Sequence, residues 1–100
     1  IYEDRGDGGR TANRVRQHHG DEIVTLVDYR NRYAQYKMDP GLRAAHLSAP
    51  FVVTWDDHEA DNDYAGDRDE HGTPSDVFLL RRTAAYQAYF EHMPLRRAQW

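Results

Sequence analysis

Cysteine is absent from this sequence of 100 residues, which excludes disulfide bonds and thiolate metal ligands within it. No apolar run approaches the roughly 20 residues that a membrane-spanning helix needs. Basic residues are outnumbered, with 13 Lys and Arg against 17 Asp and Glu. The resulting net charge of −4 argues against a nucleic-acid-binding protein that works through bulk charge.

The sequence also lacks an initiating Met and a polar tail, since it starts at Ile1 and stops at Trp100. A chain of this length can form one small domain, but its core is modest. The 12% of aromatic residues sets it apart from disordered sequences. We therefore expect residues 1–100 to be an internal fragment of a larger domain, whose signal peptide, if any, lies outside the fragment.

The first predicted helix begins near Thr25. Thr25 and Asp28 have the spacing of a capping box, with Asp in the place of the usual Glu. Apolar and aromatic side chains then recur three and four residues apart, which predicts one packed face. These residues are Leu26, Tyr29, Tyr33 and Tyr36. Arg30 and Arg32 lie between them. Pairing with phosphate or with an acidic loop is one role for these arginines, but we expect both to be solvated.

Two further helices follow from start signals in the sequence. Asp39 and Pro40 combine a capping acid with a proline suited to the first helical position. Ser75 or Asp76 is expected to cap the longest helix, at about residues 77–92. Its aromatic side chains, at helical spacing, are predicted to be core.

Residues 51–55 are the one run with strong β preference. Their nearly continuous apolar character is typical of a strand that is buried on both faces. Residues 1–2 are predicted to end another strand, and a long polar loop follows them. Strands, helices and long loops together predict an α/β or layered αββα protein, in which sites gather at the carboxyl ends of strands.

Eight carboxylates are concentrated between residues 56 and 70. They are Asp56, Asp57, Glu59, Asp61, Asp63, Asp67, Asp69 and Glu70. A solvated acidic loop is one interpretation. Because Asp56 and Asp57 directly follow the predicted strand, however, a carboxylate there would be costly to desolvate without a cation. Hard oxygen ligands suit Ca²⁺, Mg²⁺, Mn²⁺ or Fe³⁺.

An EF-hand does not fit this segment. If Asp61 took the first position, Asp63 and Gly66 would fit the third and sixth, but Ala65 would take the fifth. Gly72 stands at the twelfth position, where a bidentate Glu is required. A generic Ca²⁺-stabilised loop remains open.

His58 lies between two of these carboxylates, Asp57 and Glu59, which are expected to raise its pKa. A protonated histidine beside a metal can stabilise or protonate a leaving oxygen, as phosphoester cleavage requires. The other five histidines are interpreted as surface or structural residues. They are His18, His19, His46, His71 and His92.

Several segments together resemble the PhoD-like alkaline phosphatases and phosphodiesterases, over nearly the whole chain. The most specific is Trp-Asp-Asp-His-Glu at residues 55–59. The others are Tyr2-Glu3, residues 25–36 and 44–46, Asn62 and residues 81–96. The resemblance implies that the chain is part of a calcineurin-like metallophosphoesterase domain, with two β-sheets in a four-layer αββα fold and a dinuclear metal site at the strand ends.

The resemblance also implies a secreted, periplasmic or cell-surface enzyme that hydrolyses small phosphate mono- or diesters with Fe³⁺ and Ca²⁺. Tyr2 would bind iron, Asp57 would bind the second metal, and His58 would contact the phosphate or leaving group. Asn62 would contact either the phosphate or a residue that binds a metal. We expect attack by a metal-bound hydroxide. The bridging Asp of the family is not in the sequence, so we expect the 100 residues alone to be inactive.

A second hypothesis is a Ca²⁺-stabilised structural module without catalytic activity, in which the acidic loop only stabilises the fold. A third is an incomplete gene product. The neighbouring sequence discriminates among them, because the enzyme requires further metal ligands beyond these residues.

Overall fold

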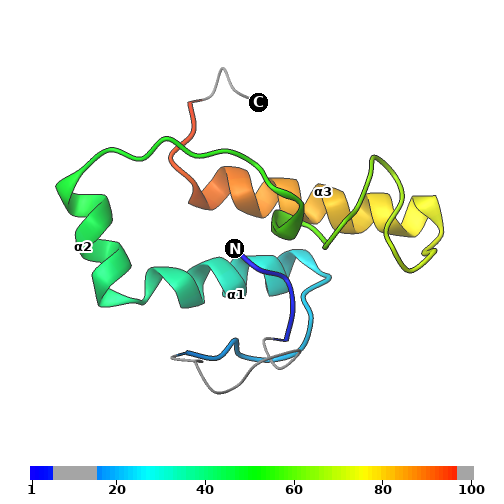
Figure 1. Cartoon of the computed structure of the whole chain (residues 1–100), viewed down its shortest axis with the longest axis horizontal. Helices are drawn as coiled ribbons and strands as arrows, with labels where there is room; N and C mark the ends of the chain where they lie inside the picture. Colours follow the sequence, from blue (N-terminus) through cyan, green and yellow to red (C-terminus); the bar gives the residue numbers. More distant parts are fainter. Residues whose placement is uncertain (6–15, 97–100) are drawn as a thin grey trace.

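The computed structural model describes residues 1–5 and 16–96, which form helices joined by irregular segments (Figure 1). The elements in chain order are α1 (Leu26–Lys37), α2 (Pro40–Ser48), the short 3₁₀ helix η1 (Asp57–Glu59) and α3 (Ser75–His92). No strand occurs within the described ranges, which hold one isolated bridge between Ala65 and Arg68. The predicted α/β or αββα class is therefore wrong for this part of the chain. None of its helices is long and apolar enough to span a membrane.

The predicted strand at residues 51–55 is irregular chain instead. Strand formation depends on a neighbouring segment that exchanges backbone hydrogen bonds, and no described segment does this for residues 51–55. Val52 is fully exposed, whereas Trp55 stacks on Tyr86 of α3 with ring centroids 4.2 Å apart. Residues 1–2 form no strand either. These segments are rich in residues that favour strands, but the partner segment that a strand needs is absent from the described residues.

The start of α1 confirms the predicted capping box. Thr25 Oγ1 accepts a hydrogen bond from the Asp28 backbone N–H at 3.2 Å, and the Asp28 carboxylate accepts one from the Thr25 N–H at 2.9 Å. The hydrogen bond from the Thr25 backbone lowers the pKa of Asp28, so the cap is ionised at neutral pH. Local chemistry alone therefore defines where α1 begins.

The second helix also begins as predicted, whereas the third does not. Asp39 caps α2 by accepting a hydrogen bond from the Leu42 N–H at 2.9 Å, and Pro40 takes the first helical position. For α3, the residue before the helix is Pro74, which makes no capping hydrogen bond. Ser75 and Asp76 lie inside the first turn, so the prediction that one of them is the cap is wrong.

The core lies between α1 and α3, which are side by side and run in the same direction (Figure 1). Tyr29 and Tyr33 of α1 face the small residues Ala85 and Ala88 of α3, which allow the two helices to approach closely. Tyr89 is also buried, as predicted, but Tyr86 is exposed. This helix pair is the platform on which the N-terminal segment and η1 rest.

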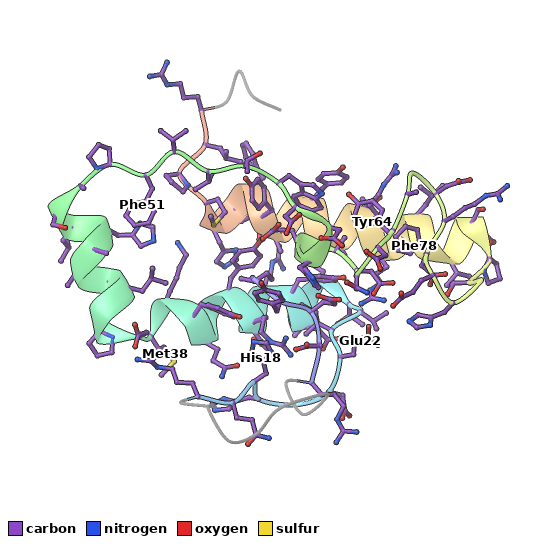
Figure 2. The ribbon with its side chains drawn as sticks, viewed as in Figure 1. His18, Glu22, Met38, Phe51, Tyr64 and Phe78 are labelled. Carbon is purple, nitrogen blue, oxygen red and sulfur yellow. The ribbon has the colours of Figure 1, made fainter. Side chains whose placement is uncertain are left out.

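The acidic loop after η1 is attached to α3. Tyr64 packs against Phe78 with ring centroids 5.6 Å apart, and Figure 2 shows the two side chains together near the start of α3. The Trp55 indole N–H donates to the Tyr64 hydroxyl at 2.6 Å. Arg82 of α3 donates to the Gly66 carbonyl at 2.6 Å. These contacts fix both sides of η1 relative to the platform.

Replacement of Ala85 by Leu tests the close helix contact. Ala85 is 0% exposed, so three extra carbon atoms force the helices apart, and we expect a loss of about 1–3 kcal/mol in the free energy of unfolding. Ala44 lies exposed in α2, so Ala44→Leu is the matched control and changes stability by about 0.5 kcal/mol or less. Urea denaturation of the protein that contains this chain measures both. Equal effects would show that the α1–α3 contact is not tightly packed.

Candidate active site

The structure brings Tyr2 and His58 together, although they are far apart in the sequence. Their ring centroids lie 4.6 Å apart. Tyr2 belongs to the N-terminal segment, which runs beside α1, and His58 belongs to η1 (Figure 1). Two of the predicted site residues thus share one location. Tyr2 is half exposed, so its ring also faces solvent.

Glu3 also contacts His58 at this location, although the sequence predicted no role for it. It is 3% exposed. Its Oε2 lies 2.9 Å from Nδ1 of His58, and its Oε1 accepts a hydrogen bond from the backbone N–H of Asn62 at 2.8 Å. Glu3 therefore links His58 to the backbone just after η1. Only its position beside Tyr2 could have indicated this, because its partners are more than fifty residues away in the chain.

The pKa of His58 is raised, as predicted, and the larger part of the rise comes from Glu3, which the prediction did not name. Burial lowers this pKa, and the hydrogen bond and charge of Glu3 outweigh burial, with smaller contributions from Asp57 and Asp56. Glu59, one of the two carboxylates expected to act, turns away and accepts a hydrogen bond from the Asp56 backbone N–H at 2.6 Å. The protonated form of His58 is thus favoured mainly by a residue from another segment.

Asp57 is held at the start of η1 by backbone hydrogen bonds. Its Oδ2 accepts from the Asp63 N–H at 2.7 Å, and its Oδ1 accepts from the His58 N–H at 3.0 Å. The Asp63 hydrogen bond is the main reason why the pKa of Asp57 is lowered. Asp57 is therefore an ionised, oriented carboxylate with lone pairs left over, a donor that suits a hard cation.

The side chain of Asn62 faces carboxylates in this structure. Its Nδ2 lies 3.4 Å from oxygens of Asp63 and Glu70. A phosphate contact would use the same amide group as a donor. The role of Asn62 in substrate binding stays a prediction.

A second acidic cluster includes Glu3, and an arginine contacts its other two members. One carboxylate oxygen each from Glu3, Glu22 and Asp61 lies within 4.8 Å of the others. Arg81 of α3 reaches Asp61 and Glu22, both at 3.3 Å, and its Nε donates to the Tyr29 hydroxyl at 2.9 Å. The guanidinium group of Arg81 thus offsets part of the negative charge of these three carboxylates.

Asp61 is the most buried member of this cluster, at 1% exposed. Burial raises its pKa to about 6, although the charge of Arg81 acts in the opposite direction. Its Oδ2 forms no hydrogen bond with the described residues, and the Arg81 guanidinium lies 3.3 Å from it. Asp61 therefore changes its charge in the range in which most carboxyl groups are already ionised.

Arg32 was expected to be solvated and is instead buried, at 2% exposed. Its Nη1 donates to the carbonyls of Tyr2 at 2.5 Å and Asp4 at 2.8 Å, and its Nη2 donates to the carbonyl of Asp21 at 3.1 Å. The prediction was wrong because these carbonyls lack a strand partner, and a planar guanidinium can serve several of them at once. Arg32 thus holds the segment that carries Tyr2 and Glu3.

Sequence and structure comparisons relate this chain to known proteins. A sequence model of the PhoD-like phosphatase family matches residues 1–100. The chain belongs to the PhoD-like phosphatase family. The resemblance to this family, which the sequence indicated at residues 55–59 and in the other matching segments, is therefore confirmed.

Two relatives show how much of the family the chain spans. It is 60% identical, over 87 residues, to alkaline phosphatase D of Bacillus subtilis (strain 168), which is 87% of this chain and 15% of that protein. A solved structure titled "Structure of PhoD" superposes with a TM-score of 0.90 and 54% identity, over 97% of this chain and 19% of that one. The helical arrangement is therefore that of a small part of a much longer protein.

The charge of Asp61 makes stability depend on pH. Because its pKa is raised in the folded state, its contribution is fully present below about pH 4 and is lost as the pH rises towards 6. We expect the wild-type protein to lose up to about 3 kcal/mol relative to Asp61→Asn across this range. Urea denaturation at a series of pH values measures the difference. The exposed Asp67→Asn control gives a flat difference, and a wild-type advantage that grows with pH would contradict the assignment.

Arg32→Lys keeps the charge but removes the planar group of donors. A lysine cannot serve all three carbonyls, and each buried acceptor left unpaired costs about 1–3 kcal/mol. We expect a loss of about 3 kcal/mol in the free energy of unfolding. Arg43→Lys, at an exposed position of α2, is the control and has little effect. Equal stabilities of the two variants would show that Arg32 does not hold the N-terminal segment.

Proposed function

We propose that the protein to which this chain belongs hydrolyses small phosphate mono- or diesters, and that this chain forms one wall of its active site. The observation that carries the proposal is the contact of Tyr2 with His58, beside the oriented carboxylate of Asp57. Family membership and the name of the relative, alkaline phosphatase D, support the same reaction. A secreted, periplasmic or cell-surface location is part of the proposal and rests on the family relationship.

The residues present fit the metal ions expected in such an enzyme. Tyr2 offers a half-exposed phenol oxygen, which suits Fe³⁺, and Asp57 offers an ionised carboxylate, which suits Ca²⁺. We propose Tyr2 as an iron ligand and Asp57 as a ligand of the second cation. Bound cations would neutralise the charge that develops on the phosphoryl oxygens.

His58 is the proposed catalytic residue of this chain. Glu3 holds its Nδ1, and no described residue forms a hydrogen bond with its Nε2. Since the protonated form is favoured, His58 holds a proton at Nε2 that it can donate to the oxygen leaving phosphorus. Asn62 is the proposed phosphate contact, and its amide would have to turn from Asp63 and Glu70 towards the substrate.

Two substitutions in the full-length protein test these roles. Asp57→Ala should abolish hydrolysis of p-nitrophenyl phosphate and lower the metal content, because it removes a ligand. His58→Ala should lower kcat by about 10²–10⁴-fold at normal metal content, because it removes a proton donor. Steady-state kinetics and elemental analysis of the purified protein measure both effects.

His71→Ala, in the exposed part of the acidic loop, is the control and should leave kcat and metal content unchanged. Retained activity with normal metal occupancy in Asp57→Ala would overturn the ligand assignment. A wild-type protein without phosphoesterase activity under any metal, but with a melting temperature raised by Ca²⁺, would favour the structural-module alternative.

A further inference from the structure

Glu3 occupies a position in which its conformation is fixed from several sides. Its backbone carbonyl accepts a hydrogen bond from the Ile23 N–H at 3.0 Å. Arg32 donates to the carbonyls of Tyr2 and Asp4, the residues before and after Glu3. Both side-chain oxygens are engaged, one with His58 and one with Asn62. A buried carboxylate held in this way has a fixed orientation and can orient the groups that it contacts.

The contact with Asn62 determines what Glu3 can offer to His58. A backbone N–H is only ever a donor, so the atom of residue 3 that faces Asn62 must be an acceptor. In Glu3 the remaining oxygen is an acceptor too, and Nδ1 of His58 must therefore carry the hydrogen of their 2.9 Å contact. The second ring nitrogen, Nε2, forms no hydrogen bond with a described residue and is the one left for a substrate.

We propose that Glu3 is the positioning residue of the active site, which sets the orientation and the tautomer of His58 so that Nε2 is presented to the leaving group. This inference rests on the proposed function and extends it to a residue outside the predicted site. Glu3 acts through His58 and touches no reacting atom.

The substitution Glu3→Gln tests the inference with almost no change of shape. The Gln oxygen must face the Asn62 N–H, so its amide nitrogen faces Nδ1 of His58. A donor at that place requires Nδ1 to be an acceptor, which disfavours the protonated ring. The analogous change in a Ser-His-Asp triad leaves the geometry intact and still lowers kcat, because the wrong tautomer results.

Steady-state kinetics of the full-length protein with two substrates provide the measurement. p-Nitrophenyl phosphate has a good leaving group that needs little protonation, whereas phenyl phosphate has a poor one. We expect Glu3→Gln to lower kcat for phenyl phosphate on the order of 10²-fold and kcat for p-nitrophenyl phosphate distinctly less, with KM changed little for either. A merely structural defect would lower both rates alike.

A double-mutant cycle shows whether Glu3 acts through His58. In a His58→Ala background, Glu3→Gln should cause no further loss beyond about twofold, because the group it positions is gone. Glu22→Gln, the same change at an exposed member of the neighbouring acidic cluster, is the matched control and should leave kcat unchanged for both substrates.

The possible outcomes separate this inference from the proposed function. If the wild type is active and His58→Ala is impaired, but Glu3→Gln is like the wild type or has additive effects, the positioning role is overturned and the function stands. A loss of metal content in Glu3→Gln would also overturn it, because Glu3 would then act on a ligand. An inactive wild type overturns the proposed function itself.

Discussion

The buried guanidinium of Arg32 is the interaction on which the rest of the site depends. The N-terminal segment has no strand partner among the described residues, so its carbonyls need donors from elsewhere. Arg32 supplies them to Tyr2 and Asp4 from the middle of α1. A helix with a well-defined start thereby fixes a segment that has no regular structure of its own. Both Tyr2 and Glu3 owe their positions to this contact.

The packed helices α1 and α3 form a second rigid part of the structure. Arg81 of α3 connects them to the loop after η1. Its guanidinium contacts Tyr29 in α1 and Asp61 in the loop, while the Tyr29 hydroxyl donates to the Ala60 carbonyl at 2.6 Å. The residues that follow His58 are therefore held against the core. The N-terminal segment and η1 meet because two arginines, one from each helix, hold them on the same platform.

Apart from the cap of α3, the features that the sequence predicted depend on neighbouring residues, and those that it missed depend on distant ones. The capping pair Thr25 and Asp28 placed the start of α1 because both partners lie within one turn. Residues 51–55 were predicted as a strand from their β preference, which says nothing about a partner segment. His58 was given the right direction of pKa shift, to which Asp57 contributes, but the larger contribution of Glu3 was missed because Glu3 is more than fifty residues away. Arg32 was misjudged for the same reason.

The acidic segment itself shows why its charge count was a poor guide to metal binding. Its carboxylates are stabilised in different ways: Asp57 and Glu59 accept backbone hydrogen bonds, and Asp61 faces Arg81. Asp69 accepts hydrogen bonds from the Thr73 hydroxyl and from the backbone of Thr73 and His71, and the Thr73 hydroxyl contributes most to lowering its pKa. At these four residues mutual repulsion is relieved without a metal ion, which weakens the case for a loop that needs Ca²⁺ in order to fold. The cation that we propose at Asp57 would serve chemistry at the neighbouring His58 rather than the stability of the loop.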